Sequence, residues 1–466
     1  MGGFFGVVSK QDCKEDLFFG TDYHSHLGTR RGGMAVFGEG GFVRRIHDIT
    51  NTQFRSKFDN DLLEMKGSKG IGVISDYEDQ PLIIGSHLGT YAIVTVGVIK
   101  NLAQLARATF GRRNTHFSEM SGGEINPTEL MAALINQESS FEEGIRSAQN
   151  QIEGSCSILI LTESGIYAAR DRVGRTPVIL GAKEDAFAVT METTAFPNLG
   201  FETTRFLGPG EIVFISDKGA EQRRAPLDRM QVCAFLWVYY GYPSSEYEGI
   251  NVEAVRNRCG AALARRDDVP VDNVAGIPDS GTAHAIGYAN EAKIPFMRPF
   301  VKYTPTWPRS FMPQDQTVRD MVARMKLLPV RDLIKDRRIL FCEDSIVRGT
   351  QLKDVIQRLY DFGAKEVHMR PACPPLVFGC KFLNFSRSRS ELDLAARRAI
   401  KRIQGDDSKH LEEYANPRSE KHCAMVNLIS EKLGLTSLRY QRLDDLVGAI
   451  GLPKEKLCTY CWDGKE

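Results

Sequence analysis

The sequence has few cysteines, almost no net charge and no long apolar run. Its 466 residues carry a formal net charge of +1, which gives no general electrostatic attraction to nucleic acid or anionic membranes. The longest apolar stretches, such as 91–99 and 233–240, have the length of core strands and are too short to span a bilayer. The first residues lack the basic segment and apolar core of a secretory signal. We therefore expect a cytoplasmic protein with neither nucleic-acid nor membrane partners.

The ten cysteines are too few for a disulfide framework in a chain of this length. Reduced thiols or metal ligands are the expected forms. The composition, with 42% apolar and 26% charged residues, is typical of a folded protein. The length predicts two or three domains.

The pattern of the chain changes near residue 228. Residues 1–228 contain short β-rich runs separated by turns, as in antiparallel sheets, and helical periodicity at 126–138 and 140–151. Across 338–370, a buried strand, a polar loop, an amphipathic helix and a second strand follow one another. This βαβ order predicts a parallel sheet in residues 229–466. The charged stretch at about 386–425 is expected to be a solvated helical insertion, with a functional basic patch as the alternative.

Two adjacent acids, Glu343 and Asp344, end the first strand of the βαβ unit, and residues 345–350 lead into its helix. Open α/β sheets bind ligands at the carboxyl ends of their strands, and loop amides near a helix N-terminus can hold a phosphate. Adjacent carboxylates repel each other, but they can accept hydrogen bonds from sugar hydroxyls or hold Mg²⁺. The segment therefore predicts a sugar-phosphate site, with a structural loop as the alternative.

These residues resemble the 5-phosphoribosyl-1-pyrophosphate (PRPP) motif of type I phosphoribosyltransferases. Segments 276–289 and 309–327 resemble the pyrophosphate loop and the catalytic loop of the amidophosphoribosyltransferase (glutamine PRPP amidotransferase) family. The resemblance implies PRPP binding by Asp279, Ser280, Gly281, Glu343, Asp344, Ser345, Ile346, Val347, Arg348, Gly349 and Thr350. It also implies Mg²⁺ at Ser280, Glu343 and Asp344, and a catalytic role for Arg309, Arg324 and Lys326 in neutralising the departing pyrophosphate. Three residues differ from the family's pattern. Glu343 stands where the family commonly has Asp, and Tyr242 and Ser244 stand where the family has an Arg and an Asp.

A CxxC motif, Cys458 to Cys461, lies close to the last residue of the sequence. Taken alone, it is compatible with a redox pair or a zinc site. The iron–sulfur branch of the same family has two further cysteines, which match Cys233 and Cys380. The resemblance implies a structural [4Fe–4S] cluster on these four residues. Zn²⁺ on the same thiolates, or an empty reduced site, remains the alternative.

The N-terminal region resembles the glutaminase domain of this family, an N-terminal-nucleophile (Ntn) hydrolase, but it lacks the groups that perform the chemistry. The family's cysteine nucleophile corresponds to Gly2, which has no side chain to attack an amide. The family's glutamine-binding Arg segment reads Ser75-Asp76-Tyr77, and its Asn-Gly-Asn segment, with an oxyanion-hole amide, reads Val96-Gly97-Val98. We therefore expect no glutamine hydrolysis.

The resemblance implies a two-domain α/β and α+β fold: an Ntn-hydrolase-like αββα sandwich (1–228) followed by a type I phosphoribosyltransferase parallel-sheet domain (229–466). The expected activity is transfer of the phosphoribosyl group of PRPP to ammonia in purine biosynthesis. The alternatives are a non-catalytic regulatory paralogue that binds PRPP or nucleotides, and a phosphoribosyltransferase with another acceptor. By analogy with the family, the protein is a homodimer or homotetramer with purine nucleotides as effectors.

Overall fold

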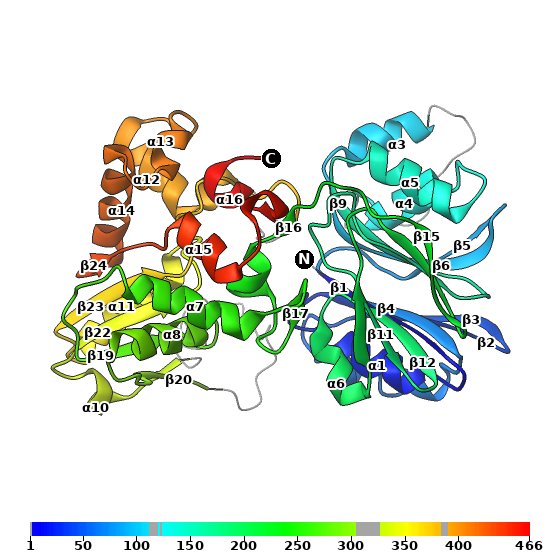
Figure 1. Ribbon diagram of the computed structural model, residues 1–466, viewed down its shortest axis with the longest axis horizontal. Helices are drawn as coiled ribbons and strands as arrows, with labels where there is room; N and C mark the ends of the chain where they lie inside the picture. The colour runs from blue at the N-terminus through cyan, green and yellow to red at the C-terminus, as the bar shows by residue number, and fades with distance from the viewer. Residues whose placement is uncertain (1, 111–119, 122–123, 304–326, 384–389) are drawn as a thin grey trace.

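The computed structural model describes residues 2–110, 120–121, 124–303, 327–383 and 390–466. Its N-terminal half contains two stacked antiparallel sheets (Figure 1). The first sheet has the order β13 (Glu202–Phe206), β11 (Ile179–Lys183), β12 (Ala186–Thr190), β1 (Gly3–Ser9), β4 (Lys69–Ser75), β2 (Arg31–Gly38) and β3 (Gly41–Asp48). The second has the order β15 (Gly219–Arg224), β14 (Ile212–Ser216), β10 (Ile166–Ala169), β9 (Gly154–Leu161), β6 (Gly89–Ile99) and β5 (Leu82–Ser86).

Helices cover the outer faces of these sheets. On the first sheet lie α1 (Lys14–Asp22) and α6 (Phe196–Leu199), and on the second lie α3 (Leu102–Phe110), α4 (Pro127–Ile135) and α5 (Phe141–Gln151) (Figure 1). The two helices predicted at 126–138 and 140–151 are present, capped by the side chains of Asn126 and Ser140. The predicted αββα sandwich is confirmed.

The C-terminal half is built on a parallel sheet in the order β19 (Asn273–Gly276), β22 (Arg338–Glu343), β23 (Glu366–Pro371) and β24 (Ser437–Leu438). Helices α7 (Val252–Ala264) and α8 (Thr282–Ala292) cover one face. Helices α11 (Thr350–Asp361), α12 (Ala395–Gln404) and α14 (Glu420–Leu433) cover the other. Leu340 packs toward α8, and Ile339 and Phe341 pack toward α11. Burial on both faces explains the uninterrupted apolar run of β22.

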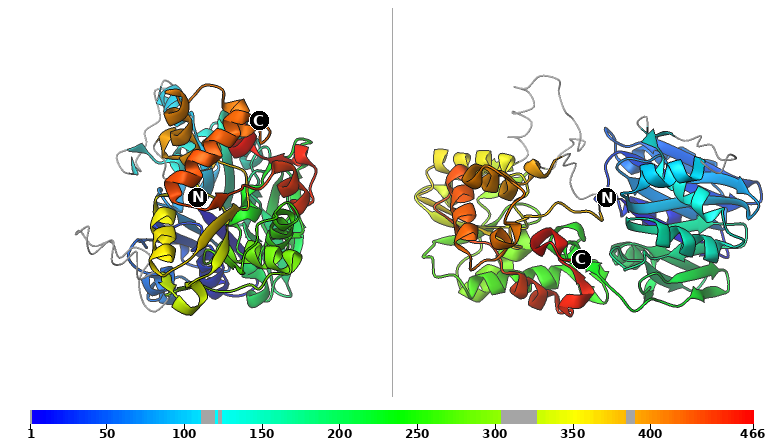
Figure 2. Two further views of the ribbon diagram at one scale, coloured as in Figure 1. Left: turned by 90° about the vertical axis from the view of Figure 1, so that its left-hand side faces the viewer. Right: turned by 90° about the horizontal axis from the view of Figure 1, so that it is seen from above.

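The C-terminal segment returns to the junction between the two halves (Figures 1 and 2). After α15 (Leu443–Ile450), strand β25 (Leu457–Cys458) pairs in parallel with β16 (Val232–Cys233), and the short helix α16 (Tyr460–Asp463) follows. One continuous hydrophobic cluster includes Phe5 of the first sheet, Trp237 and Trp462. The junction is therefore part of the protein core.

Two expectations need correction. Residues 233–240 do not form a strand: the β16 ladder ends at Cys233, and Leu236–Tyr240 form a π-helical turn closed by the Gly241 amide on the Leu236 carbonyl at 2.7 Å. An apolar run cannot by itself distinguish a buried helical turn from a strand. The described part of the 386–425 stretch is helical, as predicted, but it is packed on one side, with Ala399 and Ile400 of α12 buried in the same cluster as Met425 of α14.

The remaining elements are short. They are α2 (Phe54–Phe58), β7 (Met120–Ser121), β8 (Glu124–Ile125), β17 (Glu246–Tyr247), β18 (Ile250–Asn251), β20 (Phe300–Lys302), β21 (Leu327–Pro329), α10 (Arg331–Ile334) and α13 (Leu411–Ala415), with 3₁₀ turns at Asp61–Leu63, Thr193–Ala195, Glu391–Asp393 and Lys454–Lys456. Within the described residues, no helix is both long and apolar enough to cross a bilayer.

Candidate functional site

The acid pair and the first predicted loop meet at the carboxyl edge of the parallel sheet. Glu343 ends β22, and its Oε1 accepts hydrogen bonds from the Ser280 hydroxyl at 3.5 Å and from the Asp344 amide at 3.3 Å. Glycines allow this close approach: a β-carbon on Gly281 would lie 2.3 Å from the Cys342 carbonyl oxygen. Ser280, Glu343 and Asp344, for which the family resemblance implies one Mg²⁺ site, are thus brought together.

Burial and like charge dominate the electrostatics of this edge. Glu343 and Asp344 are both buried, and desolvation together with the neighbouring Asp344 carboxylate raises the pKa of Glu343 well above its ordinary value. The Ser345 hydroxyl donates to Asp344 at 2.6 Å. A cation beside the two carboxylates would offset their repulsion. The pair therefore has the negative charge that a Mg²⁺ site requires.

Residues 345–350 connect the acid pair to α11. Gly349 has φ of +72°, in the left-handed region that favours glycine, and α11 begins at the next residue. The predicted insertion touches this loop, because the Ala395 amide donates to the Val347 carbonyl at 2.7 Å and Arg348 pairs with Asp393 at 3.4 Å. Sequence reasoning did not place the insertion here.

The other predicted PRPP residues differ in their surroundings. Asp279 is exposed in the loop between β19 and α8 and pairs with Lys302 at the end of β20. Arg309, Arg324 and Lys326 lie outside the described residues.

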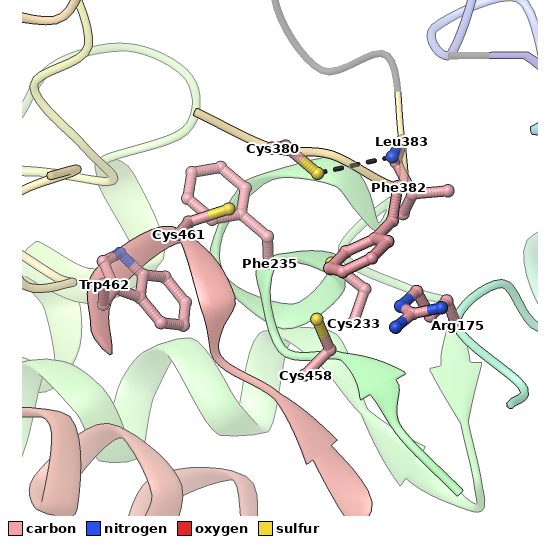
Figure 3. Close-up of a pocket in the computed structure, with 9 residues that line it drawn as sticks. All are labelled: Arg175, Cys233, Phe235, Cys380, Phe382, Leu383, Cys458, Cys461 and Trp462. Atoms are coloured by element: carbon pink, nitrogen blue, oxygen red, sulfur yellow. Dashed lines mark hydrogen bonds between the residues drawn. The ribbon is translucent and has the colours of Figure 1, made fainter. Parts of the chain in front are cut away.

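The four cysteines of the predicted cluster site line one cavity (Figure 3). Cys233 and Cys458 are register partners in the β16–β25 pair. Cys461 lies in α16, and its carbonyl accepts from the Phe378 amide at 3.1 Å, which holds the Cys380 loop against the C-terminus. All four thiols are free. Three segments that are distant in sequence therefore bring four cysteine side chains to one cavity.

Apart from the four cysteines, the cavity wall consists of three aromatic residues, one leucine and one cation. Its other lining residues are Arg175, Phe235, Phe382, Leu383 and Trp462. The Phe235 and Trp462 rings stack with centroids 5.6 Å apart. A hydrogen bond with Cys461 lowers the pKa of Cys380 to about 7, whereas burial raises the pKa of Cys458 against an opposing effect of Arg175. The sequence did not place Arg175 or the aromatic residues together at this cavity, because their contacts join separate segments.

The four sulfurs surround a space and do not converge on a point. Among the described residues, no group of three or more His, Cys, Asp or Glu side chains is placed to hold a metal ion. A tetrahedral zinc ion requires four ligands about 2.0–2.3 Å from one centre. An iron–sulfur cubane has a ligand at each iron and therefore needs thiolates distributed around a larger body. The donor set fits the cluster better than the single ion.

The structure around Gly2 is closed. Gly2 precedes β1, and a β-carbon at this position would lie 2.3 Å from the Ile74 carbonyl oxygen of β4. Ser75 donates to Glu78 at 2.7 Å, and Asp76 accepts from the Thr29 amide at 2.8 Å. Carboxylates therefore occupy the segment where the family's glutamine-binding Arg was expected. Val96–Val98 lie within β6, in continuous register with β9.

Tyr242 and Ser244, the two residues that differ from the family's Arg and Asp, contact the N-terminal half. The Tyr242 amide donates to Glu192 at 3.3 Å, and the Ser244 and Thr194 hydroxyl oxygens are 2.6 Å apart. Glu192 is buried, pairs with His26 at 2.9 Å and accepts from Tyr247 at 2.5 Å. These contacts form part of the joint between the halves, which the sequence did not predict.

Comparison with known proteins gives the same assignment for both halves. A family model described as a glutamine amidotransferase domain matches residues 69–198. The amidophosphoribosyltransferase of Archaeoglobus fulgidus is 32% identical over 332 residues, covering 71% of this chain and 72% of the relative. That of Bacillus subtilis is 29% identical over 415 residues, covering 86% and 85%.

The solved structure of the glutamine PRPP amidotransferase from B. subtilis, complexed with ADP and GMP, superposes on the chain with a TM-score of 0.86 at 26% identity. The match covers 99% of this chain and 96% of that one. The predicted two-domain fold is confirmed. On the identity and coverage of these relatives, together with the motifs and the fold, the chain belongs to the amidophosphoribosyltransferase family.

Proposed function

We propose that this protein transfers the phosphoribosyl group of PRPP to ammonia, forming 5-phosphoribosylamine for purine biosynthesis, and that it does not hydrolyse glutamine. The observation that carries the proposal is a contrast within one chain. Ser280, Glu343 and Asp344 are assembled at the sheet edge, whereas the position of the amide-attacking nucleophile is occupied by Gly2 and closed by the Ile74 carbonyl.

The residues of the sheet edge have distinct proposed tasks. Amides of 345–350 at the N-terminus of α11 bind the 5-phosphate, and Glu343 and Asp344 accept hydrogen bonds from the ribose hydroxyls. Ser280, Glu343 and Asp344 would hold Mg²⁺, which when bound supplies neutralisation of the pyrophosphate. Arg309, Arg324 and Lys326 are proposed to add positive charge as the bond between C1 and pyrophosphate breaks and the ammonia nitrogen bonds to C1.

The lost glutaminase activity is supported at three places. Gly2 offers no nucleophile and its surroundings admit none. Asp76 and Glu78 are negatively charged and would repel the α-carboxylate of a glutamine substrate, which an Arg would bind. Val96–Val98 replace polar groups by apolar side chains. Loss of one oxyanion-hole donor alone costs about a factor of 10²–10³ in rate. Because this chain is proposed not to release ammonia from glutamine, the ammonia would come from solution or from a partner protein.

We also propose a [4Fe–4S] cluster on Cys233, Cys380, Cys458 and Cys461. The support is the four-sulfur cavity and its aromatic wall. These residues would join the C-terminus to the junction of the halves, which is a structural role. Iron, sulfide and zinc analysis of anaerobically purified protein tests the proposal, and stoichiometric zinc without iron would contradict it.

The regulatory alternative rested on Tyr242 and Ser244 together with the charged stretch at 386–425. Both residues bind the N-terminal half, so these two differences are accounted for by the joint between the halves. Purine nucleotides remain proposed effectors, since the related B. subtilis structure holds ADP and GMP, and a homodimer or homotetramer remains the proposed assembly.

The decisive assay measures pyrophosphate release from Mg·PRPP with ammonium at alkaline pH, and glutamate release with glutamine. We expect turnover with ammonium only, and none in the Asp344→Asn protein. PRPP binding without turnover at any ammonium concentration would favour the regulatory alternative. Turnover with another amine or a nucleobase but not with ammonium would favour the third hypothesis. Unaided glutamate release would contradict the proposed loss of glutaminase activity.

A further inference from the structure

We infer that Arg175 is the counter-charge of the cysteine cavity, through which the N-terminal half helps to retain the bound cluster and raises its reduction potential. The inference rests on the cluster proposed above. It concerns a residue outside the four ligands and in the other half of the chain.

Arg175 reaches the cavity from the segment between β10 and β11. The side chain lines the same space as the four thiols and lies beside Cys458 and Phe382 in Figure 3. Its guanidinium carbon is 3.6 Å from the centre of the Phe382 ring. Only 7% of the residue is exposed, so its charge is largely removed from water.

The partners of this buried cation are neutral. Nη1 donates to the Gly154 carbonyl and Nη2 to the Gln231 side-chain oxygen, each at 3.3 Å. Nε is buried and has no hydrogen-bond partner, and within the described part of the chain no carboxylate pairs with Arg175. A buried charge is stable when it is paired. The anions that can pair with it are the sulfurs of the cavity.

An iron–sulfur cubane with four thiolate ligands has a net negative charge, and reduction adds one further negative charge. A fixed cation beside it stabilises both states and the reduced state more, because Coulomb attraction grows with the charge. Net charge and hydrogen bonds to the sulfurs are among the factors that set cluster potentials. Residues just outside the ligands typically change metal retention by about 10–100-fold.

A purely mechanical role can be separated from the charge role. Arg175→Lys keeps the charge and loses the planar fork, whereas Arg175→Gln keeps a hydrogen-bonding side chain and loses the charge. Gln231→Ala is the matched control, because it removes a neutral contact of the same guanidinium and leaves the charge in place.

The experiment compares the anaerobically purified full-length protein with these three variants. Iron and sulfide content, iron release to a ferrous chelator and the midpoint potential from a titration followed by electron paramagnetic resonance are measured. We expect Arg175→Gln to release iron at least about tenfold faster and to have a lower potential, with Arg175→Lys and Gln231→Ala close to the unmodified protein. Equal retention and potential in Arg175→Gln, or the same loss in Gln231→Ala, would overturn the inference while the cluster stands. An unmodified protein without iron and sulfide would overturn the cluster proposal itself.

Discussion

Restoring a cysteine at position 2 should not restore glutamine hydrolysis. The β-carbon of Gly2→Cys would lie 2.3 Å from the Ile74 carbonyl oxygen, whereas ordinary contacts begin at 3.4 Å. The two groups must therefore separate by about 1.1 Å, the difference between these distances. Ile74 is buried in β4, which is hydrogen-bonded to β1 on one side and to β2 on the other, so the backbone has little freedom to move.

The cost follows from this overlap. Overpacking of a close-packed site costs about 1–3 kcal/mol, and each kcal/mol lowers the melting temperature by about 2–4 °C for a domain of 150–250 residues. We expect Gly2→Cys to melt several degrees lower and to release no glutamate, with ammonium-dependent pyrophosphate release retained. Thermal unfolding, a coupled glutamate assay and a pyrophosphate assay measure the three quantities.

A matched control separates the added thiol from the steric effect. Gly85 lies in β5, and a β-carbon there would meet nothing within 4 Å, so Gly85→Cys should leave the melting temperature unchanged. Glutamate release by Gly2→Cys, or an unchanged melting temperature in that variant, would refute the argument that the backbone has closed over the nucleophile position.

Three further predictions concern the other sites. Asp344→Asn removes the like charge beside Glu343 and should lower the raised pKa of Glu343. Residual PRPP binding should therefore begin at a lower pH than in the unmodified protein. A pH titration of PRPP binding that shows no such shift would count against the repulsion. Cys461→Ala should lose iron and melt at a lower temperature, whereas Cys423→Ala, exposed and outside the cavity, should retain its iron; equal iron in both would contradict the ligand assignment. Glu192→Ala leaves the buried groups of the joint unpaired and should destabilise the fold by about 3–5 kcal/mol in denaturant titrations, and a change below 1 kcal/mol would exclude an important role for this contact.

The local features of the chain were predictable from the order of its residues. The βαβ unit over 338–370, its acid pair and its glycine loop could be read directly, because strand and helix burial follow short periodicities and because a parallel strand places its last residues at a ligand-binding edge. The missing side chain of Gly2 is also visible in the sequence, but the match of Gly2 to a nucleophile position rests on the resemblance to the family. The grouping of the four cysteines, however, came from resemblance to a family and not from their spacing.

Contacts between distant segments became visible only in the folded chain. The β16–β25 register brings Cys233 to Cys458, the Phe378 amide holds the Cys380 loop, and Arg175 enters the same cavity from the other half of the chain. The helical turn at 236–240 and the contact of Ala395 with the loop 345–350 also depend on packing. Periodicity records whether a residue is buried but not against what it is buried, so contacts between segments far apart in sequence become visible only when the core is assembled.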